Sequence, residues 1–128
     1  MTIDLRHVRV DPIEGGWHLV EITQVRSGVT SVKQLPQIKF VTRIVDDADP
    51  DAGRFVNWSN TLEGDGLEFT ARCLTAMEVD LTQAYEEEEL FPLLVGKRLY
   101  VHVRQDTRNG QAFLRVNDWQ PEDGDFLD

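Results

Sequence analysis

The chain has a single cysteine and no long apolar run, and both shortages limit what it can be. Cys73 alone cannot form an intramolecular disulfide, which indicates a reducing compartment. The first ten residues include Asp4, Arg6 and Arg9, so they lack the apolar stretch of a secretory signal. No apolar run approaches the length that spans a bilayer. We therefore expect a soluble, cytoplasmic protein.

Motifs of catalysis and metal binding are also missing. The sequence holds no nucleophile motif and no glycine-rich phosphate loop. Its histidines have no partners at metal-ligand spacing. The alternating aspartates of residues 46–53 resemble the start of a calcium loop, but Pro50 intrudes and Ala52 replaces the required glycine. We expect no enzymatic activity, no metal and no cofactor.

Positive charge is scarce, since 13 basic residues face 23 acidic ones for a net charge of −10. Phosphate-binding domains are usually basic, so this balance argues against nucleic acid. The acids are clustered, however: the last eleven residues hold five of them and no base, and residues 46–51 and 86–89 hold two further clusters. Salt screens exposed charges beyond roughly 8–10 Å. The local potential therefore decides, and the rest of the chain is mildly positive.

Alternating polar and apolar residues predict five strands, over 17–26, 37–45, 54–58, 98–106 and 111–119. Between the third and fourth strands, apolar residues from Leu67 onward follow the spacing of an amphipathic helix. A second short helix is expected over 82–90, ended by Pro92. Asn109-Gly110 predicts a type I′ hairpin turn between the last two strands.

This order of elements is that of the five-stranded OB barrel, in which a helix follows the third strand. The length of 128 residues fits one domain. We predict a mostly β protein: an OB-fold barrel over 1–119, with one or two helices between strands 3 and 4, and a disordered acidic tail over 120–128. The tail is too polar to bury an apolar core of its own.

Strand alternation also assigns side chains to faces. In the fourth strand it places Leu99, Val101 and Val103 inward. In the fifth it places Ala112, Leu114 and Val116 inward, and Phe113, Arg115, Asn117 and Trp119 outward. Trp58 has two interpretations, a base-stacking ring or a core residue, and the core is favoured. Cys73, between apolar residues of the helix, is expected to be buried.

Several short segments form a set of landmarks: GWHLVEI at 16–22, FVTR at 40–43, WSNTL at 58–62, LTAM at 74–77 and LVGK at 94–97, before a strand and the Asn-Gly hairpin. Together they resemble the small OB-fold single-stranded-DNA-binding proteins of tailed phages, over Gly16 to Trp119. The resemblance implies DNA binding without sequence preference, in phage-type replication or recombination, within the host cytoplasm.

Two sets of residues are candidates for nucleic-acid binding, because aromatic rings stack on bases and basic side chains follow the phosphates. The outward row of the last hairpin gives Tyr100, His102, Arg104, Phe113 and Arg115, while Lys33, Lys39, Arg43, Arg54 and Arg108 give a second basic set. Ordinary solvated strand exteriors are the alternative for both sets.

The tail is the candidate partner-binding segment, through Asp123, Asp125, Phe126, Leu127 and Asp128. Proteins of the resembled family carry acidic C-termini that end in or near Phe and dock replication or recombination proteins. The alternative for the whole chain is an acidic protein-interaction module, a phage DNA mimic or host-protein inhibitor. A homodimer is compatible with either.

Overall fold

The computed structural model describes residues 1–4, 6 and 11–123 and contains one five-stranded antiparallel sheet and two α-helices. The strands are β1 (Gly16–Val29), β2 (Pro36–Ile44), β3 (Phe55–Thr61), β4 (Arg98–Arg108) and β5 (Gln111–Pro121). A 3-10 turn η1 (Gly64–Gly66) leads into α1 (Leu67–Ala76), and α2 (Glu87–Leu94) precedes β4. The predicted five strands and their order along the chain are confirmed.

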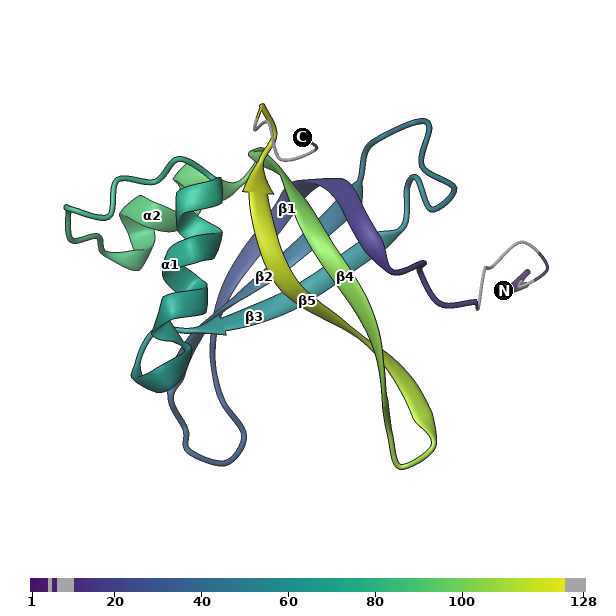
Figure 1. Ribbon diagram of the computed structural model, residues 1–128, viewed down its shortest axis with the longest axis horizontal. Coiled ribbons are helices and arrows are strands. Elements are labelled where there is room, and N and C mark those ends of the chain that lie inside the picture. The colour runs from purple at the N-terminus through teal and green to yellow at the C-terminus, as the bar shows by residue number, and fades with distance from the viewer. Residues whose placement is uncertain (5, 7–10, 124–128) are drawn as a thin grey trace.

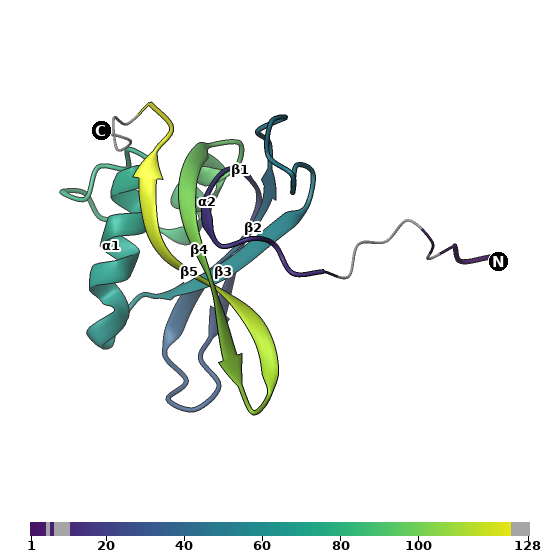
Figure 2. The same cartoon turned by 45° about the vertical axis from the view of Figure 1, so that its right-hand side comes forward.

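The sheet has the strand order β3-β2-β1-β4-β5 and is open between β3 and β5. It curls so that these two edge strands cross near each other in both ribbon views (Figures 1 and 2). The indole rings of Trp58 on β3 and Trp119 on β5 lie 6.5 Å apart across the gap. Helix α1 contacts both edge strands. The two tryptophans and α1 thus connect β3 and β5, which no backbone hydrogen-bonded ladder connects.

The core lies inside the curl, where alternate residues of each strand point. On β2 the alternate residues Ile38, Phe40, Thr42 and Ile44 are all buried, as the alternation of a strand requires. On β4 the inward set of Leu99, Val101 and Val103 is confirmed. Trp58 is a core residue, as favoured from the sequence, and its ring stacks on Phe40 at 5.0 Å.

The predicted faces of β5 are partly wrong, because the strand contains a β-bulge. His102 pairs with Asp118 and Val103 with Val116, so Asn117 is an extra residue opposite β4. One extra residue reverses the alternation beyond it. Trp119, predicted to point outward, is therefore buried opposite Val101.

Ala112 and Leu114, predicted to point inward, are exposed. Their part of the β4–β5 hairpin projects beyond the sheet as a two-stranded ribbon, where neither face has a core to cover (Figure 1).

The helices also differ in part from the prediction. Cys73 is buried on α1 as expected. Helix α2 begins at Glu87 and contains Pro92, which was expected to end it. A proline removes the hydrogen bond to the carbonyl four residues earlier, here that of Glu88. Since Glu88 is exposed, water can solvate that carbonyl, and the proline is tolerated.

Candidate nucleic-acid interface

The basic side chains of this protein fall into two groups, distinguished by whether they have an acidic partner. Arg6, Arg54, Arg72, Arg98, Arg104 and Arg115 form ion pairs with carboxylates. Arg26, Lys33, Lys39, Arg43, Lys97 and Arg108 form none with any residue in the described ranges. A cation without a carboxylate partner is available to a phosphate. We call the second group the unpaired cations, because none of them pairs with a described carboxylate, and they are the candidates for contact with an anionic ligand.

Three of the unpaired cations lie on one surface, the outer face of β1, β2 and β3. Arg26 on β1 is directly opposite Lys39 on β2, and both are exposed. Arg43 on β2 is opposite Phe55 on β3, and its guanidinium carbon lies 5.1 Å from the centre of that ring. We call these four residues the basic-aromatic face.

Phe55 was not among the residues predicted to bind nucleic acid. It is 52% exposed, so its ring is open to solvent on the outer face of the sheet. The alternation of β3 contains the signal that could have found it. Val56 and Trp58 point inward, so their neighbours Phe55 and Asn57 must point outward.

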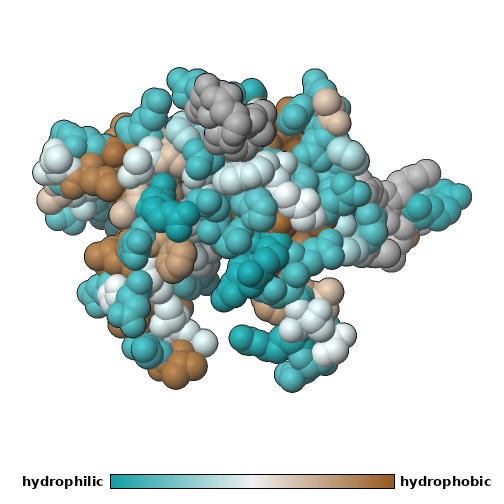
Figure 3. All heavy atoms as spheres, viewed as in Figure 1, coloured by the Kyte–Doolittle hydropathy of each residue, from teal (hydrophilic) through white to brown (hydrophobic). Residues whose placement is uncertain are grey.

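Two more unpaired cations lie on loops at one end of the sheet. Lys33 is in the loop between β1 and β2, and Arg108 precedes the tight turn between β4 and β5. Asn109 and Gly110 have φ angles of 53° and 79°, which confirms the predicted turn with positive φ at both positions. Both loops project from the same end of the molecule (Figure 1), and the space-filling view shows a hollow between them (Figure 3).

The candidate row on β4 and β5 is present, but its members are engaged within the protein. The Arg104 guanidinium donates two hydrogen bonds to Asp106, of 3.1 and 3.0 Å, and Arg115 lies 3.6 Å from the same carboxylate. These arginines, Arg104 foremost, hold the pKa of Asp106 below its usual value. Tyr100 and His102 are half-buried, and the His102 ring contacts Trp17 edge-on at 5.1 Å. Phe113 is 40% exposed, with Arg108 above its ring at 5.9 Å.

Arg54 is separated from the other members of its predicted set. Its guanidinium donates to the Asp51 carboxylate at 3.0 Å and to the Asp11 carbonyl at 2.6 Å. The side chain therefore ties the β2–β3 loop to the segment before β1. Of the second predicted set, Lys33, Lys39, Arg43 and Arg108 keep unpaired charges, and Arg54 does not.

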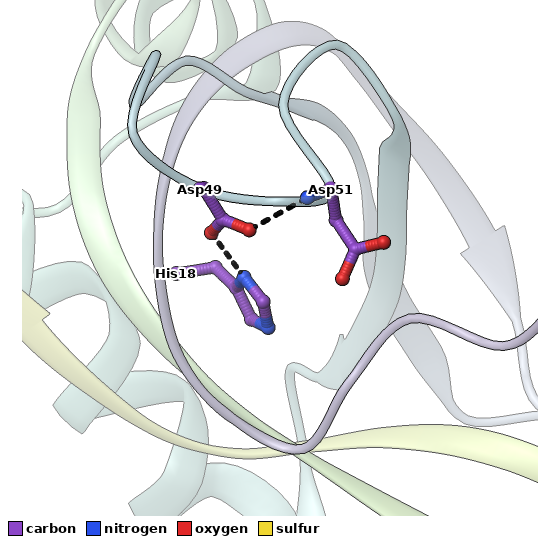
Figure 4. A group of neighbouring side chains, drawn as sticks. All are labelled: His18, Asp49 and Asp51. Carbon is purple, nitrogen blue, oxygen red and sulfur yellow. Dashed lines mark hydrogen bonds and ion pairs between the residues drawn. The ribbon is translucent and has the colours of Figure 1, made fainter.

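The structure brings together three residues of metal-ligand type that the sequence separates: His18, Asp49 and Asp51, whose ligand atoms lie within 4.8 Å of one another (Figure 4). The His18 Nδ1 atom lies 2.5 Å from an Asp49 oxygen, while Nε2 donates to the Glu14 carbonyl at 2.7 Å. A zinc ion bound to both atoms would need about 2.0–2.2 Å to each. A nitrogen–oxygen gap of 2.5 Å leaves no such space between them.

Charge in this cluster is already balanced by protein groups. Asp51 is 1% exposed and accepts from Arg54 and from the Glu14 amide, the latter at 3.1 Å. The other carboxylate, that of Asp49, is engaged by the His18 imidazole. The geometry is thus that of a hydrogen-bonded cluster that attaches the segment before β1 to the β2–β3 loop, and we call it the His18 cluster.

The predicted tail begins within the last strand. Strand β5 extends to Pro121, two residues beyond the predicted end of the barrel at Trp119. Asp123 is exposed. The other four candidate partner-binding residues, Asp125, Phe126, Leu127 and Asp128, lie outside the described residues.

Among the described residues, neither helix has the length and apolar character needed to cross a membrane.

No protein-family model matches this chain, and no curated protein matches it in sequence.

Proposed function

We propose that this protein binds single-stranded DNA without sequence preference, in phage-type DNA replication or recombination, through an OB-type barrel. The strand order β3-β2-β1-β4-β5, with α1 between β3 and β4, supports the OB assignment. In this proposal β3 and β5 close the barrel through Trp58, Trp119 and α1, and not through a continuous hydrogen-bonded ladder.

One observation supports the function most: the segregation of unpaired cations. Arg26, Lys39 and Arg43 share the basic-aromatic face, and Lys33 and Arg108 belong to the β1–β2 and β4–β5 connections that border the hollow at one end. A strand lying across the face and between the loops would meet five unpaired charges. Each neutralised phosphate releases counterions, which favours binding at low salt.

Phe55 supplies what a face for single strands needs beyond charge. Unpaired bases stack on aromatic rings for about 1–3 kcal/mol each, whatever their sequence. Arg43 beside the ring adds a partner for the phosphate of the stacked nucleotide. Duplex DNA keeps its bases stacked inside, so it would gain only the charge contacts.

The net charge of −10 does not oppose this proposal, because two clusters of acids lie away from the hollow between the two projecting loops. Residues 86–89 lie on or just before α2, beside α1, and the aspartates of residues 46–51 lie in the β2–β3 loop (Figure 1). That loop is at the end of the sheet opposite the two projecting loops. Screening limits its effect on the hollow.

The test is binding of fluorescein-labelled oligo-dT to the full-length protein, followed by anisotropy as salt is raised. At roughly 0.7 counterions released per phosphate, five contacts predict that the logarithm of the binding constant falls with the logarithm of the salt concentration, with a slope of about −3.5. Oligo-dT should bind at low salt and more tightly than a duplex of equal length. Absence of binding at low salt would contradict the proposal.

A second candidate function, an acidic DNA mimic or host-protein inhibitor, has one specific observation in its favour. The four glutamates of residues 86–89 are exposed and form no ion pair with a described residue. A host-lysate pull-down compared with an oligo-dT gel shift separates the two candidates. Retention of a DNA-binding host protein together with no shift of oligo-dT would favour the mimic.

A further inference from the structure

A groove of about 390 Å³ lies where the sheet is open, and the basic-aromatic face does not include it. Edge strand β3 supplies one wall through Ser59, Asn60 and Thr61. The other wall comes from β4 and β5, and Gly66 and Phe69 at the start of α1 complete it. We call it the β3–β5 groove.

Two polar atoms of residues that line this groove are buried and lack a partner. They are the Thr61 hydroxyl oxygen and the Trp119 indole nitrogen, neither of which hydrogen-bonds to a described residue. Trp119 is only 5% exposed. Buried polar groups are nearly always satisfied, so an unsatisfied donor at a groove indicates a missing acceptor.

The other side chains that line the groove indicate which kind of ligand could supply that acceptor. Arg104 and Arg115 are directly opposite each other on β4 and β5 and share one carboxylate, Asp106, which leaves an excess positive charge at the rim. The Phe69 ring is 47% exposed, with Arg72 above it at 5.7 Å. The excess positive charge at the rim suits a phosphate, the exposed Phe69 ring suits the plane of a base, and the Trp119 indole N–H suits a base carbonyl. Together these are the parts of one nucleotide.

We propose that the β3–β5 groove holds one nucleobase of the bound strand, with Trp119 donating to a base carbonyl and Arg104 and Arg115 facing the phosphate. This inference rests on the proposed function and adds to it one base-dependent contact at the sheet opening, within binding that is otherwise independent of sequence. Thymine, guanine and cytosine carry a carbonyl and adenine does not, so the groove favours oligo-dT over oligo-dA.

The groove is continuous with the basic-aromatic face. Lys39 on β2 is directly opposite Ser59 on β3, and Ser59 lines the groove. Neighbouring strands are about 4.8 Å apart, so a DNA strand that leaves Lys39 needs to cross only β3 to enter the groove.

The test follows the indole N–H signals of the ¹⁵N-labelled full-length protein by NMR. Oligo-dT and an abasic strand of the same length are added in parallel at low salt. Trp119 should shift downfield with oligo-dT and remain in place with the abasic strand, while the Lys39 and Arg43 amides shift with both. Trp58 is the internal control, because its indole N–H already donates to Asn60 at 2.9 Å.

Three results would overturn the inference, and they differ in what they leave standing. If the Lys39 and Arg43 amides shift at saturation and Trp119 does not, the groove holds no base but the DNA-binding function survives. If Trp119 shifts equally with the abasic strand, the groove responds to the backbone and not to a base. If no signal moves with either strand, the proposed function fails as well.

A substitution gives an independent measurement. Thr61→Val removes the unpartnered hydroxyl while keeping the shape of the side chain. It should weaken oligo-dT binding by about 2- to 10-fold, the size of one hydrogen bond, and remove part of the preference over oligo-dA. Thr107→Val, at an exposed position of the ribbon, is the matched control and should change neither value. Equal affinities for all three proteins would argue against a base in the groove.

Discussion

At the scale of single residues, the absence of ion pairs identifies the candidate interface better than the presence of basic residues does. Arg104 and Lys39 are both exposed basic residues on strands, yet Arg104 is held by Asp106 and Lys39 has no ion pair with a described residue. A paired cation gains less from a phosphate, because its carboxylate already offsets part of its charge, whereas an unpaired one exchanges only water and salt.

The charges of the face can be tested by the double substitution Lys39→Gln, Arg43→Gln. Loss of two phosphate contacts should weaken oligo-dT binding and reduce the log–log salt slope by about 1.4, at roughly 0.7 per contact. Anisotropy titrations over a range of NaCl concentrations measure both quantities.

The control for this pair is Lys97→Gln, which removes an equally unpaired charge located just before β4 and away from the face. Its salt slope should match that of the unmodified protein. If Lys97→Gln reduced the salt slope by as much per removed charge as the double variant does, net charge, and not this face, would govern binding.

Phe55 allows a test of stacking that is separate from charge. Phe55→Ala should weaken oligo-dT binding by about 5- to 150-fold, the equivalent of one stacked base at ~1–3 kcal/mol, without changing the salt slope. Because Phe55 is exposed, the free energy of unfolding should change little.

Leu93→Ala on α2 removes a similarly exposed apolar side chain and serves as the control in the same binding assay. An unchanged affinity for Phe55→Ala would remove this ring from the interface.

At the scale of elements, α1 supplies a pH-dependent contribution to stability. Burial raises the pKa of the Cys73 thiol to about 12. The unfolded thiol ionises near ~8.5, so above that pH the unfolded chain loses a proton that the folded chain keeps. The stabilising contribution is therefore complete below ~8.5 and is lost as pH rises toward 12.

The melting temperature should accordingly fall from pH 8.5 to about 10.5 more steeply for the unmodified protein than for Cys73→Ala. Because the lysines and tyrosines titrate in both proteins, their contribution cancels when the slopes of melting temperature against pH are compared. Parallel slopes would show that the folded thiol ionises normally.

The His18 cluster tests how the segment before β1 is attached. His18→Gln cannot bond to both Asp49 and the Glu14 carbonyl, which leaves a buried carboxylate without its partner. Removing one partner of a buried pair costs about 3–5 kcal/mol, and urea unfolding should report a loss approaching that size.

His102→Gln is the matched control, because His102 is only half-buried and its Nδ1 bonds to the neutral Asn117 side chain at 2.7 Å. Its loss should be smaller. Titrating Zn²⁺ into the unmodified protein provides a separate check, and a large rise in melting temperature would contradict the hydrogen-bonded description of the cluster.

At the scale of the whole molecule, the acidic C-terminus and the basic-aromatic face should act separately. A protein that ends at Asp123 keeps β5 complete, since that strand ends at Pro121, and loses the acids Asp125 and Asp128. Its oligo-dT affinity should be unchanged or tighter, because removing negative charge reduces repulsion of the phosphates. A marked loss in the anisotropy assay would assign residues 124–128 to DNA binding.

Much of the fold follows from the sequence, because local patterns specify it. The alternation in β2 and β4 needs no distant partner to be recognised, and Asn109-Gly110 specifies its turn through backbone sterics alone. Helix α2 and β5 were less predictable. The end of α2 depends on whether water solvates the Glu88 carbonyl, and the face of Trp119 depends on a bulge that forms only when β5 pairs with β4.

The candidate site, like the fold, was only partly predictable from the sequence. The sequence by itself determined which residues are basic or aromatic and, through alternation, that Lys39 and Arg43 point outward. Only the tertiary structure decided which of these charges are available. Ion pairs such as Arg72 with Asp118 and Arg98 with Glu21, and the joining of His18 to Asp49, depend on chain segments far apart in the sequence that folding brings within a few ångströms. The composition gives the number of charged residues, whereas the distances between them in the fold determine which basic side chains form no ion pair with a described residue.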